Sequence, residues 1–184
     1  MTEAGREVKG YDFHYGPATQ ARSLAYAVVH CLLAGDAGPD DGALVDAVLD
    51  FWQVADLAGL HERGAQGFVA DYFERNRLLG EMAPLAAASD GAPLARRECD
   101  RAAEMLGTGI RLVGGCFAGD AVSVALIGGM VRSPYMQDAM ERALSKSTNR
   151  RYDIKEYNIV EPAASGEAAT TRMALGMILP STPA

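Results

Sequence analysis

Apolar residues recur at helical spacing through most of residues 18–117, and this periodicity limits the fold more than any other feature of the chain. The clearest run comprises Leu44, Val45, Val48, Leu49 and Trp52. After residue 118 the pattern changes to a short apolar strand, a helix and a second strand with alternating side chains. That order predicts a parallel or mixed α/β layer next to a large helical block.

Turn and capping residues mark where several predicted elements begin and end. Gly35 lies near the end of the first helix, and Asp40 or Asp41 is the expected N-cap of the second. Pro93 falls in the first turn of a long helix that reaches residue 117. Residues 18–117 are therefore expected to be almost entirely helical.

The remaining predicted elements have weaker signals. One or two short helices are expected in residues 56–76, and another in residues 77–89 with Pro84 at or near a kink. A short strand is expected around Val8–Phe13 and a small-residue-rich helix over Ala163–Gly176.

Charge and composition exclude two classes of partner. The chain has 184 residues, 49% of them apolar, and a net charge of −7. Nonspecific binding to nucleic acid or to an anionic membrane surface would need a basic face. A local basic cluster is still compatible with this charge; Asn149 to Arg151 is one candidate, and it is expected to be a solvated loop.

The cellular compartment is predicted from what the sequence lacks. No window approaches the roughly 20 apolar residues of a membrane span, and the first ten residues lack the apolar core of a signal peptide. Cys31, Cys99 and Cys116 are far apart and form no CxxC motif. We therefore expect a cytoplasmic protein with reduced thiols and no structural metal.

The junction between the strand Val122–Ile127 and the helix Ser133–Ser145 is the main candidate site. Gly128 and Gly129 follow the strand, Ser133 is the expected N-cap, and Pro134 the first helical residue. Ligands in open α/β sheets bind beyond the carboxyl ends of strands, where glycine allows close approach to the backbone. From these residues alone a tight turn without a ligand is equally expected.

The stretch ALIGGMVRSPYMQDAM resembles the adenosine motif of the actin-like ATPase superfamily, which includes sugar kinases, heat-shock chaperone ATPases and actin. Within it, the chain is most similar to the BadF/BadG/BcrA/BcrD ATPase and N-acetylglucosamine kinase family. The resemblance implies a ribonuclease-H-like second domain with a large helical N-terminal portion. Residues 1–184 would form this single domain, mainly helical over 18–117, with the adenosine-motif layer over 118–179.

The resemblance also implies site residues and a cofactor. ATP would be bound with Mg²⁺, and the residue that matches Arg132 packs on the adenine face in the chaperone branch. The implied nucleotide-binding residues are Gly128, Gly129, Met130 and Arg132, with Ser133 and Gln137 at the rim of the pocket.

Other segments agree with this resemblance, but the phosphate-binding motifs are missing. Residues 93–117 resemble the long helix before the adenosine strand, and VEPAASGEAATTRMALG resembles the second connecting helix. Where many relatives have a Gly-Asp-Glu-Gly-Ser loop, this chain has Tyr-Gly-Pro-Ala. We find neither the Asp-Gly-Gly-x-(Ser/Thr) loop nor the Gly-Thr-Gly-Ser hairpin of the family. The phosphoryl-transfer groups would therefore come from a partner chain.

No other residues assemble a catalytic set from the sequence. Asp12 with His14 is a possible acid–base pair but is expected to be solvated. His30 is expected in the core or on a helix surface, and His61 with Glu62 lacks the second histidine of a zinc motif. The GTG at residues 107–109 falls inside a helical pattern, which favours a loosened helix over a phosphate loop.

Three functional hypotheses follow. The first is a subunit of a split ATP-dependent kinase or ATPase, with the active site at the interface with a partner chain or a second copy. The second is a non-catalytic, kinase-like protein that binds and regulates a partner. The third is a helical protein whose α/β layer is purely structural. Contact between Arg132 and a nucleotide distinguishes the first from the others.

Overall fold

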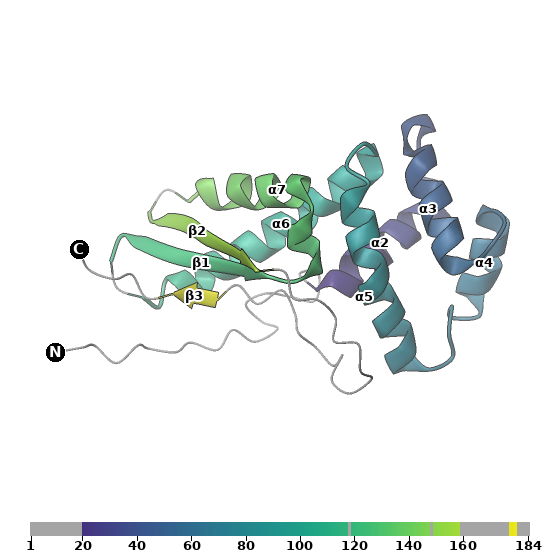
Figure 1. Cartoon of the computed structure of the whole chain (residues 1–184), viewed down its shortest axis with the longest axis horizontal. Helices are drawn as coiled ribbons and strands as arrows, with labels where there is room; N and C mark the ends of the chain where they lie inside the picture. The colour runs from purple at the N-terminus through teal and green to yellow at the C-terminus, as the bar shows by residue number, and fades with distance from the viewer. Residues whose placement is uncertain (1–19, 118, 148, 159–176, 180–184) are drawn as a thin grey trace.

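The computed structural model describes residues 20–117, 119–147, 149–158 and 177–179 (Figure 1). This part of the chain is mixed α/β and mostly helical, as the sequence predicts. Its helices are α2 (Ala21–Ala34), α3 (Gly42–Trp52), α4 (Leu57–Ala65), α5 (Tyr72–Ala88), α6 (Pro93–Gly114) and α7 (Pro134–Ser145). It also contains two 3₁₀ turns, η2 (Pro39–Asp41) and η3 (Gly129–Arg132). Its strands are β1 (Ala121–Ile127), β2 (Arg151–Asn158) and β3 (Met177–Leu179). The predicted Val8–Phe13 strand and Ala163–Gly176 helix lie outside the described residues.

The strands form one small sheet in the order β2-β1-β3. β1 and β2 are parallel and connected through α7, which confirms the predicted parallel or mixed layer, while β3 is antiparallel to β1. The register pairs Val122 with Tyr152 and Val124 with Ile154, and it shifts between Val124 and Ala125. β3 was not predicted, because three residues are too few for an alternating pattern to stand out.

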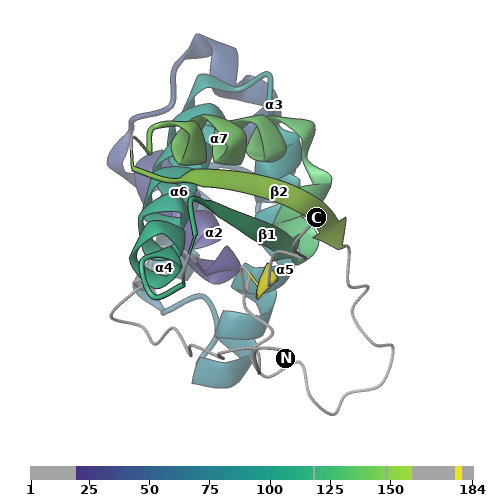
Figure 2. The ribbon, with the colours of Figure 1, turned by 90° about the vertical axis from the view of Figure 1, so that its left-hand side faces the viewer.

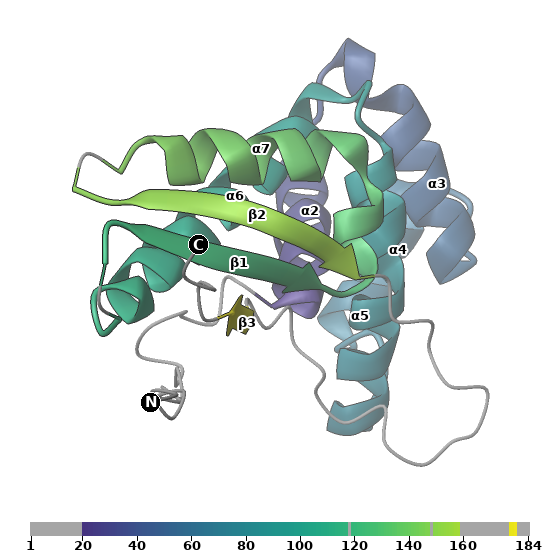
Figure 3. The same cartoon turned by 60° about the vertical axis from the view of Figure 1, so that its left-hand side comes forward.

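One face of the sheet is covered by helices. Val122, Val124 and Leu126 of β1 are buried, and α6 and α7 lie on that side of the sheet (Figures 2 and 3). α7 approaches α6 closely at Gly107, where an added Cβ would lie 3.1 Å from the Cβ of Ala143. The GTG segment is thus helical and not a phosphate loop, as predicted, but it belongs to the continuous helix α6 and is not loosened. Its first glycine allows the close helix packing.

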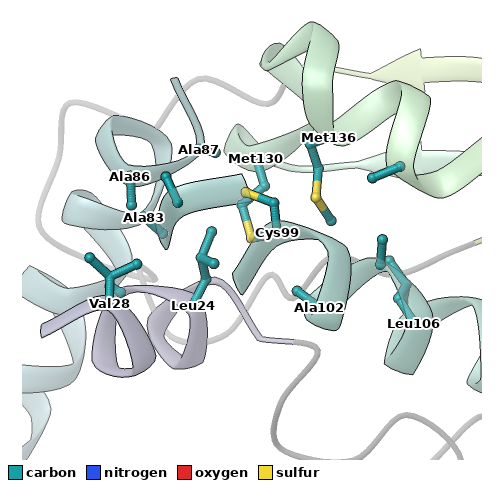
Figure 4. Close-up of a cluster of buried hydrophobic side chains, with 14 of the residues drawn as sticks. Leu24, Val28, Ala83, Ala86, Ala87, Cys99, Ala102, Leu106, Met130 and Met136 are labelled. Atoms are coloured by element: carbon teal, nitrogen blue, oxygen red, sulfur yellow. The ribbon is translucent and has the colours of Figure 1, made fainter. Parts of the chain in front are cut away.

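The helical block and the sheet layer share one hydrophobic core (Figure 4). α2 packs along α5, and α6 packs along α7. Buried side chains of all four helices meet in this core. The joint between β1 and α7, which contains η3, therefore packs against α5 and α7. These helices determine how much of the joint a ligand can reach.

Most predicted helix ends agree with the structure. Gly35 ends α2 in the left-handed conformation, with φ of 81°. Ser133 caps α7, and Pro134 is its first residue. In the segment predicted as separate helices over 56–76 and 77–89, the structure has α4 and then one longer helix, α5, which contains Pro84. Asp71 starts α5 earlier than predicted, because its carboxylate accepts a 2.7 Å hydrogen bond from Glu74 N.

Asp41 precedes α3 as predicted, but its carboxylate does not cap that helix. One oxygen accepts a 2.8 Å bond from Gly38 N and the other a 2.8 Å bond from Leu94 N in the first turn of α6. Asp41 is buried, and the free N–H groups at the start of α6 are the donors within its reach. It therefore ties the start of α3 to the start of α6.

Candidate functional site at the glycine joint

Gly128 ends β1 in a backbone conformation that only glycine adopts readily. Its φ of 136° and ψ of 171° lie in a region where a Cβ would clash with the backbone. Gly129 begins η3, and an added Cβ there would lie 3.1 Å from Pro84 Cγ of α5. The close approach that Gly129 permits is thus made by α5.

Met130 and Val131 turn inward from η3 and are buried, with Met130 5% exposed. Figure 4 shows the Met130 side chain in the core near Cys99 of α6. Burial raises the pKa of the Cys99 thiol to about 12, and the nearby charges of Asp100 and Glu98 act in the same direction. The Met130 side chain therefore lies in a dry, packed environment.

Ser133 is buried and its hydroxyl has two partners inside the protein. Ser133 Oγ donates a 2.7 Å hydrogen bond to the carbonyl of Ala87 near the end of α5. The same oxygen accepts a 3.3 Å bond from Met136 N, as an N-cap does. Ser133 thus joins two helix ends, α5 and α7, at the glycine joint.

Gln137 lies one turn into α7 and is half-buried. Its amide nitrogen donates to the carbonyl of Val131, which holds η3 against α7. The contact joins residues on either side of Ser133, the N-cap of α7.

Arg132 differs from the other five predicted residues. Its side chain is exposed, and no hydrogen bond or ion pair links it to any residue in the described ranges. Arg132 is the last residue of η3, which follows the carboxyl end of β1. The structure therefore brings all six residues into one joint, and only Arg132 offers a free side chain there.

A cluster that sequence reasoning missed fixes the first turn of α7 on α6. Tyr135 Oη donates a 2.9 Å bond to Asp100, whose other oxygen accepts a 2.8 Å bond from Arg142. The guanidinium groups of Arg96 and Arg142 lie 5.5 Å and 5.4 Å from the centre of the Tyr135 ring. Burial and the Asp100 carboxylate raise the pKa of Tyr135. The two hydrogen bonds join residues 35 and 42 positions apart, so no local pattern indicates the cluster.

The basic segment at Asn149 to Arg151 makes contacts within the protein, whereas a solvated loop was predicted. Arg150 is half-buried and donates to the carbonyls of Gly114 and Phe117. Arg151 lies 3.0 Å from Asp153, and Lys155 lies 3.7 Å from the same carboxylate. An open cleft of about 740 Å³ between α7 and β2 has these cations on its wall. Arg150 is thus held by two backbone carbonyls, and Arg151 and Lys155 share one carboxylate, that of Asp153.

A second cleft, of about 660 Å³, lies between α2, α4 and α5. His30 and His61, which no sequence pattern connects, both line it. The cleft is also lined by Tyr26, Arg75 and Asn76, and the rest of its lining consists of apolar residues and glycines. This cleft lies away from the glycine joint, toward the opposite end of α5.

The Asp12 and His14 pair lies outside the described residues. Within the described part of the chain, no group of three or more histidine, cysteine, aspartate or glutamate residues could hold a metal ion. None of the helices in that part is long and apolar enough to cross a membrane. No protein-family model matches the sequence, and no curated protein matches it either.

Proposed function

We propose that this chain is the adenosine-binding part of a two-part ATP-dependent kinase or ATPase similar to the BadF/BadG/BcrA/BcrD family. The phosphate-binding and phosphoryl-transfer groups would lie on a partner chain, in the cytoplasm. The β2-β1-β3 sheet with α6 and α7 would then be part of a ribonuclease-H-like layer. The proposal rests on the resemblance of residues 125–140 to the adenosine motif and on the geometry of the glycine joint.

One observation carries the proposal: Arg132 is exposed and without a described partner at the carboxyl end of β1. Carboxyl ends of strands are where open α/β sheets bind nucleotides. A guanidinium in that position can stack on the flat face of adenine, since it is planar and weakly hydrated. Gly128 has no side chain that could obstruct a ligand there.

The residues of the joint fall into two groups: those that could contact the nucleotide and those that position η3. Arg132 and the backbone at Gly128 are the groups that face outward and could touch adenine. Met130, Ser133 and Gln137 point into the protein and hold η3 on α5 and α7. Gly129 lets η3 approach Pro84. In this proposal the last four are positioning residues, and only the first two contact the nucleotide.

The residues present suit the adenosine end of ATP but not its phosphates or Mg²⁺. The described part of the chain has no group of three or more histidine, cysteine, aspartate or glutamate residues that could hold a metal ion, and the sequence has neither phosphate-binding motif of the family. ATP would supply the γ-phosphoryl group for transfer to a sugar-like hydroxyl or to water. The chain's own part would be to bind and orient the adenosine end.

The test is calorimetric titration with ATP and Mg²⁺, on the chain alone and on the complex that copurifies with it from its native host. Arg132→Ala should weaken binding by about 1 to 2 kcal/mol, which is about 5- to 30-fold in Kd. Arg101→Ala is the matched control, because Arg101 is a similarly exposed arginine on α6, away from the joint. Equal affinity of the Arg132→Ala variant and the unmodified protein would remove Arg132 from the site.

A second candidate function, partner binding without catalysis, is favoured by exposed aromatic side chains. Phe73 is 73% exposed and Tyr72 is 55% exposed at the start of α5. Large exposed apolar groups are common where proteins bind partners. If neither the chain nor its native complex binds nucleotide, this second function replaces the first.

A further inference from the structure

We propose that the cleft between α2, α4 and α5 is a binding site for a small organic anion that contains a flat apolar ring. This site is separate from the glycine joint and does not depend on the ATP proposal. The cleft is lined from Tyr26 and His30 on α2, His61 on α4 and Arg75 on α5, among others. Its volume of about 660 Å³ falls in the range of small-molecule sites, which is about 300 to 1,000 Å³.

The floor and walls offer apolar surface to a ring. Val29, Leu33 and Leu79 come from the two helices that pack along each other, α2 and α5. Phe68 closes one side, and its ring lies 4.6 Å from the ring of Trp52 behind it. Gly64 makes room for this arrangement, because an added Cβ would lie 3.3 Å from both Leu33 and Phe68.

Flat side chains stand at the mouth of the cleft. The rings of Tyr26 and His30 are 5.6 Å apart and inclined by only 31°. Both side chains are exposed, so a ligand ring can reach them without displacing protein. Stacking on such faces adds to the burial of apolar area, which favours a flat ring over a branched chain.

The polar groups that line the cleft select for negative charge. Arg75 carries a positive charge and the imidazoles of His30 and His61 can donate hydrogen bonds, whereas the lining contains no aspartate or glutamate among the described residues. The chain as a whole has a net charge of −7, so a cleft lined by a cation and by no carboxylate runs against its composition. Charge complementarity of this kind recognises an anion.

Several donors of the cleft have capacity left for a ligand. Within the described ranges, the side chains of His61 and Asn76 have no hydrogen-bond partner. Arg75 uses Nη1 for long bonds of 3.3 Å to the Gly67 carbonyl and 3.5 Å to the Val69 carbonyl. Its Nε and Nη2 remain for a carboxylate, sulfonate or phosphate, which a guanidinium binds through two nitrogens.

The loop beside the cleft is held in an unfavourable backbone conformation. Phe68 has φ of 60°, in the left-handed region that bulky residues avoid, and it follows Gly67 with φ of 78°. The Arg75 bonds to Gly67 and Val69 bracket Phe68 and hold this turn. Such conformations persist where surrounding contacts fix them, and they concentrate at binding sites. Here the result is a fixed aromatic wall with the guanidinium beside it.

The experiment uses two dyes that differ by one charged group. 1-Anilinonaphthalene-8-sulfonate has a flat ring system and a sulfonate, and N-phenyl-1-naphthylamine is its neutral counterpart. Titrated into the full chain and followed by fluorescence and calorimetry, the sulfonate should bind one site saturably and more tightly than the neutral dye. Equal affinity for the two dyes, or no saturable binding of the sulfonate, would overturn the proposal.

Two substitutions locate the bound dye. His61→Glu should weaken sulfonate binding about tenfold or more, since it places a negative charge beside the sulfonate, and should leave the neutral dye unchanged. His61 is exposed and has no described hydrogen bond, so the fold should tolerate this change. Ala43→Glu, at an exposed position of α3 outside the cleft, adds the same charge and should leave both dyes unchanged. Equal weakening by both variants would mean a general charge effect and would overturn the site.

Arg75→Gln is the second substitution that tests where the dye binds, and Arg77→Gln is its control. Arg77 is on the same helix, but it pairs with Glu74 and Glu81 instead of lining the cleft. Only Arg75→Gln should weaken the sulfonate, and circular dichroism verifies that both variants are folded. If Arg132→Ala instead of Arg75→Gln removes sulfonate binding, the dye occupies the glycine joint and the cleft proposal fails.

Discussion

The two ends of α5 meet their surroundings in opposite ways. Near its carboxyl end, Pro84 and the Ala87 carbonyl are in close contact with Gly129 and Ser133 of the glycine joint. Near its amino end, Arg75 and Asn76 border an open cleft in which polar groups have few partners. The two regions are about 16 Å apart along the axis, at ~1.5 Å per residue.

In this protein, the residues of the glycine motif and the residues with donors available to a ligand are in different places. The glycine pair carries the more recognisable sequence signal, yet one of its glycines and most of its side chains are used in internal packing. The cleft carries no motif, yet it combines volume, apolar walls and uncommitted donors. A residue that is already satisfied inside the protein contributes to stability, and a residue without partners is available to a ligand.

The largest effect is expected for Met130→Ala in the joint. Removing this buried side chain should lower the free energy of unfolding by about 2 to 5 kcal/mol, because a cavity forms where it packs between helices. Urea denaturation measures the loss. The neighbouring Arg132→Ala is the control and should change stability by no more than about 0.5 kcal/mol, since Arg132 is exposed. If both variants cost the same, Met130 does not pack in the core.

The next effect is expected for Gly128→Ala. The substituted residue would have to keep φ of 136°, which should cost about 1 to 3 kcal/mol of stability. Thermal unfolding followed by circular dichroism reports the change. Gly91→Ala is a suitable control, because Gly91 is exposed and an added Cβ there meets no atom within 4 Å. A Gly128→Ala variant as stable as the control would show that the joint relaxes into an ordinary turn.

A smaller loss, about 1 to 2 kcal/mol, is expected for Ser133→Ala. The change removes the cap on Met136 N and leaves the buried Ala87 carbonyl without its 2.7 Å partner. Ser133→Thr keeps the hydroxyl and should recover most of the stability in the same urea titration. Ser145→Ala removes an exposed hydroxyl at the other end of α7 and serves as the control. Failure of threonine to rescue would indicate that the hydroxyl bonds are not what matters.

The smallest effect is expected at the cleft. His61→Ala and Asn76→Ala should each change the free energy of unfolding by less than about 0.5 kcal/mol, because neither side chain has a described hydrogen bond to lose. The same urea titration measures both. A loss above about 1 kcal/mol at either residue would make it a structural residue and would remove the contrast between the two ends of α5.

The elements best predicted from sequence are those whose signal is local. Helical apolar spacing located α2, α3, α6 and α7, and Gly35 and Ser133 marked ends that the structure confirms. The apolar run before Gly128 predicted β1 almost residue for residue. In the candidate site, the position of the joint and the N-cap role of Ser133 followed from the same local rules, because a cap bonds to residues three positions away.

Features that depend on distant residues were missed or misread. The tie from Asp41 to Leu94 spans 53 positions, and the packing of Gly129 on Pro84 spans 45. Arg150 was predicted to be solvated, but its guanidinium reaches the carbonyls at the end of α6. Nothing near any of these residues in the chain indicates its partner.

By itself, the sequence determined where most of the described helices and the two parallel strands begin and end, and that this parallel pair follows a helical block. Backbone hydrogen bonds and side-chain periodicity act over a few residues, so the order of residue types is enough to specify them. The tertiary structure decided which groups remain available. It closed the joint around Met130 and Ser133, left Arg132 outside, and brought His30 and His61 from separate helices to one cleft. Burial and the pairing of polar groups depend on how elements pack, and packing is a property of the whole core.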